Sequence, residues 1–195
     1  MTVEDDGRTR CGWIDQTRLA PADFVLYRDY HDTEWGQPLR ESAALFERIS
    51  LEAFQSGLSW LIILRKRENF RRAFHGFDVE RIARYTKRDI DRLMADTGIV
   101  RNRAEDRGHH RQRACCLPTS TSISVSCCGR SRRRRVHDPP TCPRFPAVTP
   151  ESTAMAKELK RRGFRFVGPT TAYALMQATG MVDDHIADCW VPAGR

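Results

Sequence analysis

The chain has 195 residues, of which 40% are hydrophobic, and these figures suit one domain with a single core spanning residues 1–195. No apolar run reaches the roughly 20 residues that a membrane-spanning helix needs, and residues 1–10 are acidic and polar rather than signal-like. We therefore expect a cytoplasmic protein with no membrane association.

The formal net charge of +8 is concentrated in one stretch of the sequence. Residues 101–135 contain ten arginines and two acidic residues, so this stretch accounts for the whole positive excess. An argument from net charge for nucleic-acid binding therefore rests on one segment and needs support from elsewhere in the chain.

Residues 42–99 carry the pattern of consecutive helices. Ser42 can cap a first helix whose apolar residues recur at three-to-four spacing: Leu45, Phe46, Ile49, Ala53 and Phe54. Gly57 and Ser59 then break the pattern, and Trp60 begins a second helix that runs toward Phe74.

Two shorter helices are predicted next. Asp78 opens one over residues 78–85. Thr86, with Asp89 three residues later, resembles a capping box at the start of the other, and Gly98 suits its C-terminal cap.

The last third predicts two helices joined by a tight hairpin. Pro150 directly follows Thr149, Gly163 ends the first helix, and residues 164–168 connect it to a second helix over 169–179. The free amides at the start of that second helix, around Gly168 and Thr170, can bind a phosphate oxygen of a DNA backbone. The alternative is an ordinary helical turn.

Residues 105–145 follow none of these patterns. They hold five of the seven cysteines and the block of arginines 130–135, with neither helical nor strand periodicity. Three hypotheses remain open: a disordered basic arm, a second zinc site, or the product of a reading-frame slip. Adjacent cysteine pairs chelate zinc poorly because neighbouring side chains diverge, and the abrupt change at both ends of the segment favours the frame slip.

Four potential metal ligands lie outside that segment, namely Cys11, His31, His185 and Cys189. His185 and Cys189 are four residues apart, which on a helix would place both side chains on one face. Cys11 and His31 could complete a tetrahedral structural site that joins the two ends of the chain. The alternative is that all four are packed core residues.

The second group of candidates is aromatic: Trp13, Tyr27, Tyr30, Trp35 and Trp60. Glu52 lies on the apolar helix that ends shortly before Trp60. Flat π-faces with one carboxylate suit an electron-poor, cationic heterocycle through stacking, cation–π attraction and charge pairing. The alternative is plain core packing with Glu52 exposed.

Motifs along the chain resemble those of the DNA-3-methyladenine glycosylase I family. The resemblance covers roughly residues 9–103 and 147–192 and lies in a series of motifs in the family's order, namely Arg10-Cys11-Gly12-Trp13, Tyr30-His31-Asp32-x-Glu34-Trp35-Gly36, Leu51-Glu52, Gly57-Leu58-Ser59-Trp60, Lys66-Arg67-Glu68-Asn69, Gly98-Ile99-x-Arg101, Lys160-x-Arg162-Gly163-Phe164-x-Phe166-Val167-Gly168, and Asp184-His185 with Cys189. Relatives continue after Arg103 with a regular helix, where this chain has the cysteine- and arginine-rich stretch.

The resemblance implies an all-α helix-hairpin-helix glycosylase fold with a structural zinc at Cys11, His31, His185 and Cys189. It implies hydrolysis of the N-glycosidic bond of 3-methyladenine in double-stranded alkylated DNA, a step of base excision repair. We expect the protein to be a monomer. It assigns Glu52 to the damaged base, with Tyr27, Tyr30 and Trp60 lining the pocket and Trp13 nearby.

Two further positions follow from the same resemblance. Wider relatives place a catalytic aspartate where this chain has Asp183, although many members of the family carry asparagine, so Asp183 is a secondary catalytic candidate. Relatives that also cut the sugar-phosphate chain have a lysine at the position of Thr170, so we expect no lyase activity. Two alternatives are a non-catalytic, zinc-stabilised DNA-binding module and a glycosylase made defective by its altered middle segment.

Overall fold

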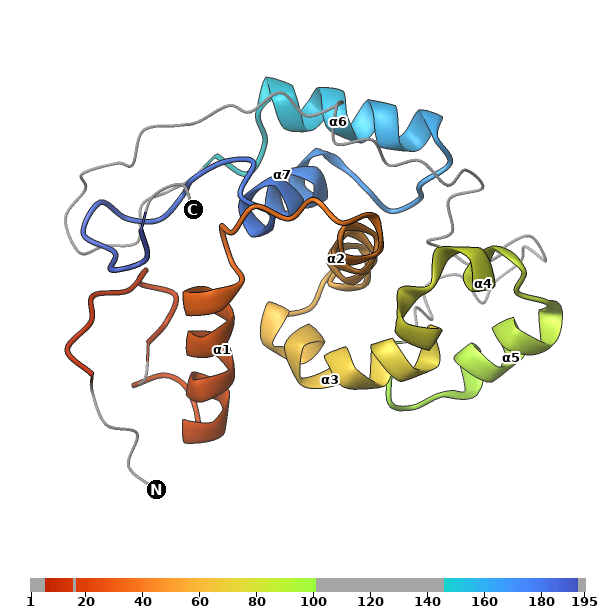
Figure 1. Ribbon diagram of the computed structural model, residues 1–195, viewed down its shortest axis with the longest axis horizontal. Coiled ribbons are helices and arrows are strands. Elements are labelled where there is room, and N and C mark those ends of the chain that lie inside the picture. Colours follow the sequence, from red (N-terminus) through yellow and green to blue (C-terminus); the bar gives the residue numbers. More distant parts are fainter. Residues whose placement is uncertain (1–5, 16, 101–145, 193–195) are drawn as a thin grey trace.

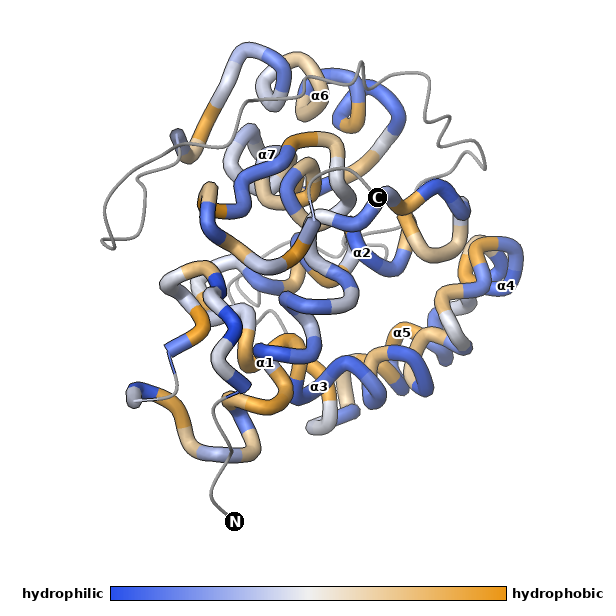
Figure 2. The backbone as a smooth tube through the Cα atoms, turned by 60° about the vertical axis from the view of Figure 1, so that its left-hand side comes forward, coloured by the Kyte–Doolittle hydropathy of each residue, from blue (hydrophilic) through white to orange (hydrophobic). Residues whose placement is uncertain are grey.

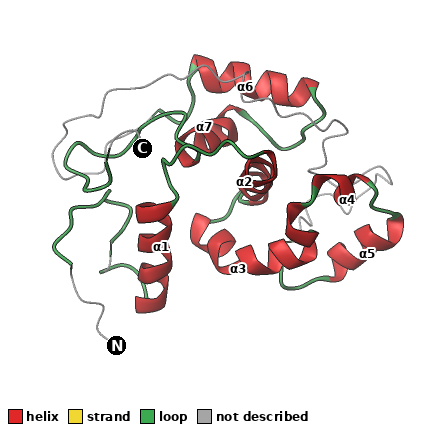
Figure 3. Ribbon diagram, in the orientation of Figure 1, coloured by secondary structure: helices red, strands yellow, loops and turns green. Residues whose placement is uncertain are grey.

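The computed structural model describes residues 6–15, 17–100 and 146–192. Within these ranges every regular element is a helix and no strand occurs (Figure 3), which confirms the all-α prediction for this part of the chain. The elements in order are α1 (Pro21–Thr33), α2 (Ser42–Phe54), α3 (Trp60–Ala73), the 3-10 turn η1 (His75–Phe77), α4 (Val79–Ala83), α5 (Lys87–Ala95), α6 (Pro150–Arg161) and α7 (Pro169–Ala178).

Helix α2 lies at the centre of the molecule, between α3 and α7 (Figure 1). Its predicted apolar face is buried, with Leu45, Phe46 and Ile49 each at most 3% exposed. Arg48 and Glu52 are buried on the same helix. Burial around the helix therefore places two ionisable groups in the interior, where charges need partners.

The helix-hairpin-helix unit is formed by α6, a tight connector and α7, which pack against each other. Thr149 and Ser152 form a reciprocal capping box at the start of α6, with Pro150 in the first turn. Gly163 follows the end of α6 with a φ of 94°, a conformation that glycine adopts without steric cost. These features confirm the prediction for this unit.

The two ends of the described chain lie side by side next to α1 (Figure 1). The backbone amide of Trp190 donates a hydrogen bond to the carbonyl of Thr9 at 2.9 Å. Residues 181–192 contain bends and turns but no helix or strand, so both ends approach α1 as irregular segments. Along the tube, apolar stretches recur on each helix and in the C-terminal segment (Figure 2).

Helix α1 was absent from the sequence-based expectations, although its signals are present in retrospect. Pro21 occupies the first turn and Asp23 adds the acidic residue that favours a helix N-terminus. Phe24, Tyr27, Tyr30 and His31 recur at three-to-four spacing, as expected for one helical face. Because this face carries tyrosines and a histidine in place of aliphatic residues, the sequence does not show the plain apolar stripe that marks a buried helix face.

Two predicted caps are wrong. Glu41, not Ser42, is the N-cap of α2, and Ser42 is already the first helical residue. Helix α5 ends at Ala95 with Asp96 as its C-cap, so Gly98 lies beyond the helix. The Gly98 amide instead donates to the Asp96 side chain at 2.7 Å. This hydrogen bond closes a turn after the helix, so Gly98 does not act as its cap.

The predicted irregular segment, residues 105–145, lies outside the described residues. In the part of the chain that the structure does describe, each helix is too short or too polar to span a bilayer.

We expect Gly180→Ala to destabilise the fold by about 2 kcal/mol or more, as measured by urea unfolding. Gly180 has a φ of +66°, and a Cβ there would lie 2.6 Å from the Gly36 carbonyl oxygen. Because that oxygen is a backbone atom, relieving the clash would require the chain itself to move. Gly76→Ala is the matched control because Gly76 has a φ of +69° with no atom within 4 Å of the added Cβ. It should cost only about 1 kcal/mol. Equal losses in the two variants would contradict a role for the close approach.

Candidate functional site

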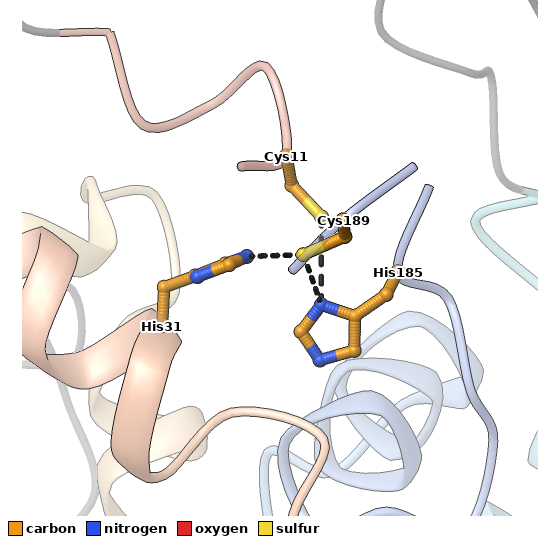
Figure 4. Close-up of side chains that lie close together, drawn as sticks. All are labelled: Cys11, His31, His185 and Cys189. Carbon is orange, nitrogen blue, oxygen red and sulfur yellow. Dashed lines mark hydrogen bonds between the residues drawn. The ribbon is translucent and has the colours of Figure 1, made fainter. Parts of the chain in front are cut away.

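Four buried side chains from three distant segments meet in one group (Figure 4). Cys11 comes from the N-terminal segment, His31 from the last turn of α1, and His185 and Cys189 from the segment after α7. Their four candidate ligand atoms lie within 4.8 Å of one another. The structure thus brings together all four residues that the sequence proposed as metal ligands.

The distances within this group suit a tetrahedral metal ion. The Cys189 Sγ atom lies 3.4 Å from His185 Nδ1 and 3.6 Å from His31 Nε2, and Cys11 Sγ lies 3.6 Å from His185 Nδ1. Metal–sulfur bonds of about 2.3 Å and metal–nitrogen bonds of about 2.0 Å at a tetrahedral angle place sulfur and nitrogen about 3.5 Å apart. Two thiolates and two imidazoles are a donor set that can hold a metal ion here.

The second nitrogen of each histidine has an acceptor. His31 Nδ1 lies 2.8 Å from Asp32 Oδ1, and His185 Nε2 lies 3.3 Å from the Trp35 carbonyl. Metal-binding histidines commonly donate their other ring N–H to such oxygens, which fixes the tautomer and the ring orientation. The arrangement directs His31 Nε2 and His185 Nδ1 toward the two sulfurs.

Backbone shape also holds His185 in place. Gly36 has a φ of +77°, and a Cβ at this position would lie 2.7 Å from His185 Nε2. The ring therefore fits only against a residue without a side chain. The predicted helix for His185 and Cys189 is wrong: a turn in which the Cys189 amide bonds to the Ile186 carbonyl brings the two side chains together instead.

Hydrogen bonds favour the negatively charged forms of Cys189 and of the neighbouring Asp32. The pKa of the Cys189 thiol lies well below its usual range because Cys11 and then His185 stabilise its thiolate, against the opposing effect of burial. Burial alone would raise the pKa of Asp32. Hydrogen bonds from Arg10, His31 and Trp190 outweigh this effect, so the pKa of Asp32 lies below its usual value. Both groups are thereby held as anions, the form that a metal site requires.

The predicted aromatic residues form a cluster directly beside the four ligands. The ring of Trp13 lies 5.5 Å from Tyr27 and 6.4 Å from Tyr30, and the ring of Tyr30 lies 5.5 Å from Trp60. Trp13 also meets His31 edge-on at 5.3 Å. We call Trp13, Tyr27, Tyr30 and Trp60 the aromatic cluster. Since Tyr27, Tyr30 and His31 all belong to α1, the ligand group and this cluster share one helix.

Glu52 is buried, at 6% exposure, rather than solvent-facing. Burial raises its pKa to about 8, and the positive charge of Arg48 opposes this shift. Burial raises the pKa of Tyr30, and the negative charge of Glu52 adds to this shift, so the carboxyl group interacts electrostatically with a member of the aromatic cluster. The alternative of an exposed Glu52 is therefore wrong.

Two buried polar side chains, those of Trp60 and Glu52, have spare hydrogen-bonding capacity in the described structure. The indole Nε1 of Trp60 is buried with no hydrogen-bond partner in the described structure. Over the same ranges, Glu52 accepts no hydrogen bond. Buried polar groups are nearly always paired in folded proteins, so an unpaired indole N–H and a carboxyl group without a donor are both available to a polar ligand.

Arg48 is a residue of this site that the sequence interpretation missed. Its Nη1 donates to the Tyr30 hydroxyl oxygen at 2.7 Å, and its Nη2 donates to Glu34 Oε2 at 2.9 Å. Glu34 also accepts from Arg67 at 2.7 Å. A charged residue on the apolar face of α2, four residues before Glu52, was the available signal.

The other predicted residues belong to neither of these two groups. Asp183 is half-buried in the segment after α7, and its carboxylate accepts from the His185 amide at 3.3 Å. Gly168 is the N-cap of α7, and Thr170 lies exposed in the first turn of that helix. The space around Gly168 is open, since a Cβ there would meet nothing within 4 Å.

Comparisons with known proteins agree with this architecture. The methyladenine glycosylase family profile matches residues 21–192. A DNA-3-methyladenine glycosylase of Haemophilus influenzae is 40% identical over 191 residues, covering 93% of this chain and 96% of its own. DNA-3-methyladenine glycosylase 1 of Escherichia coli strain K12 is 39% identical over 184 residues, covering 92% and 95%.

Solved structures give the same result. A crystal structure of 3-methyladenine DNA glycosylase I superposes with a TM-score of 0.76 at 38% identity, covering 93% of this chain and 98% of its own. A variant of such an enzyme in complex with 3-methyladenine superposes with a TM-score of 0.75 at 32% identity, covering 95% and 99%. With a family profile that matches most of its length and relatives near 40% identity, the chain belongs to the methyladenine glycosylase family.

Proposed function

We propose that this chain is a monofunctional DNA glycosylase that hydrolyses the N-glycosidic bond of 3-methyladenine in double-stranded alkylated DNA. The observation that carries the proposal is the buried Glu52 without a hydrogen-bond donor in the described structure, close to the aromatic cluster. Relatives that bear the name of this activity match this chain over nearly their whole length.

The chemistry of the lesion suits this arrangement. A 3-methyladenine base in DNA already carries a positive charge, so its glycosidic bond is weak and the leaving group needs no acid. The protein has to take the base out of the duplex, stack it on aromatic faces, and stabilise the charge that develops on the sugar as water adds. Trp13, Tyr27, Tyr30 and Trp60 supply the faces, and ionised Glu52 pairs with the cation.

We assign the DNA backbone contact to the start of α7. Gly168 leaves room for a phosphate to approach, and the first-turn amides around Thr170 can donate to it without reading sequence. The hydroxyl of Thr170 cannot form the imine that a lyase needs, so hydrolysis alone is expected. Asp183 remains a secondary catalytic candidate, which could orient the attacking water.

We assign a structural zinc ion to Cys11, His31, His185 and Cys189. All four ligands are protein side chains, and the second ring nitrogen of each histidine has an acceptor. No ligand position therefore remains for water, and the ion would supply folding energy rather than chemistry. Free thiolates as ligands suit a reducing compartment, in keeping with a cytoplasmic protein. We further propose that the whole chain is one glycosylase domain that acts as a monomer.

We expect Glu52→Gln to lower the rate of 3-methyladenine release from methylated duplex DNA by about 100-fold or more, because it removes the anion that pairs with the base. Release is measured by chromatography of the freed base. Glu47→Gln is the matched control, since Glu47 lies on the same helix and pairs with Arg67 and Arg71. It should lose stability but keep its rate within about threefold. DNA binding by the parent protein with no base release would favour the non-catalytic DNA-binding module.

The pKa of Glu52 predicts a pH profile. With this pKa near 8, the carboxyl group of the free protein is mostly neutral at pH 7. We expect kcat/KM to rise about tenfold per pH unit toward pH 8 and then level off, because it reports the free enzyme. The folded chain holds this proton more tightly than the unfolded chain, so stability should fall as pH rises from 4.5 toward 8. Glu52→Gln should flatten both profiles, and a parent profile that is flat from pH 6.5 to 9 would refute the assignment.

We expect Cys189→Ala to abolish stoichiometric zinc binding and to lower the melting temperature by about 10 °C or more. Metal content is measured by atomic emission and melting by circular dichroism. A chelator should lower the melting temperature of the parent protein and leave that of Cys189→Ala unchanged. An unchanged melting temperature after complete loss of zinc would show that the metal has no structural role.

A further inference from the structure

Arg48 is a buried cation with two fixed partners. Only 5% of its surface is exposed, and it bonds the Tyr30 hydroxyl through one terminal nitrogen and Glu34 through the other. Glu34 is in turn held by Arg67 of α3 at 2.7 Å. The guanidinium therefore joins α1 to α2, and its fork geometry leaves it little freedom to turn away from Tyr30.

The bond between Arg48 and Tyr30 has one direction. A guanidinium carries donors and no acceptor, so the phenol oxygen must accept the hydrogen bond at 2.7 Å. The hydroxyl hydrogen of Tyr30 is then left for another acceptor, and the described residues offer none. Donation from a charged group also polarises the O–H bond and makes it a stronger donor.

We propose that Arg48 is a positioning residue that keeps the Tyr30 hydroxyl as a hydrogen-bond donor toward the bound methylated adenine. This inference rests on the proposed function. Tyr30 then presents a donor, Trp60 presents its unpaired indole N–H, and Glu52 presents an acceptor. An adenine ring, with acceptor nitrogens and an exocyclic amine, can satisfy such a set.

Glu34 makes a buried arginine compatible with a cationic adduct. An isolated positive charge four residues from Glu52 would repel the damaged base and compete for the carboxylate. Because Glu34 accepts from Arg48 at 2.9 Å, the charge of Arg48 is offset on the side away from Tyr30. The arginine can thus orient the phenol while most of the attraction of Glu52 remains for the base.

The test is the affinity for free 3-methyladenine, measured by calorimetry on the full chain for the parent, Arg48→Met, Tyr30→Phe and the double variant. We expect Arg48→Met to weaken binding by about tenfold, as for loss of one charge-assisted hydrogen bond. In the Tyr30→Phe background the same change should matter less than twofold, because the hydroxyl that Arg48 orients is gone. Equal losses in both backgrounds, or no loss in either, would overturn the inference.

Arg65→Met is the control for a purely structural effect. Arg65 also ties α3 to α1, through an exposed ion pair with Asp23, and does not touch Tyr30. Its affinity for 3-methyladenine should stay within twofold of the parent value, and a tenfold loss would contradict a specific role for Arg48. Should Arg48→Met fail to fold, the same comparisons with Arg48→Gln decide the matter.

The outcomes separate this inference from the proposed function. A parent protein that neither binds 3-methyladenine nor releases it from DNA refutes both. A parent protein that does both, with additive losses for Arg48→Met and Tyr30→Phe, keeps the function and refutes the role of Arg48 alone.

Discussion

The structure depends on one junction, where Cys11 and the pair His185 and Cys189 meet His31 on α1. The two end segments contain no regular element of their own near this point, so they are held by side-chain contacts and by the Trp190–Thr9 hydrogen bond. Arg10 and the Trp190 indole, one from each segment, both donate to Asp32 beside His31. A metal ion held by these side chains would cross-link residues far apart in sequence and so remove much freedom from the unfolded chain. These four side chains therefore join both end segments to α1 at one point.

The same junction positions the aromatic cluster. His31 directly follows Tyr30, and Trp13 lies two residues after Cys11, so each ligand fixes the backbone beside an aromatic ring. Candidate metal ligands and the aromatic residues proposed to bind the base thus alternate along the same short segments. Site geometry held by such neighbours tolerates little displacement, because stacking and hydrogen bonding both need ring positions fixed within a fraction of an ångström.

The interior of the protein also contains ionisable side chains. Helix α2 carries Arg48 and Glu52 into the interior, and their environments differ: Arg48 has two hydrogen-bonded partners, whereas Glu52 has none in the described structure. A paired group stabilises the fold, while an unpaired one keeps its interaction capacity for a ligand. The cost of leaving Glu52 unpaired is offset by the apolar packing of the same helix.

The sequence by itself determined the helical class, most helix positions from α2 to α7, and the candidate ligands and aromatic residues, because apolar spacing, capping residues and family motifs are local properties of the chain. Tertiary structure decided the rest. Packing sets whether Glu52 is buried, a turn rather than a helix brings His185 to Cys189, and Arg48 meets Tyr30 across two helices. Such pairings join residues distant in sequence, and no local pattern encodes which of many buried groups will become neighbours.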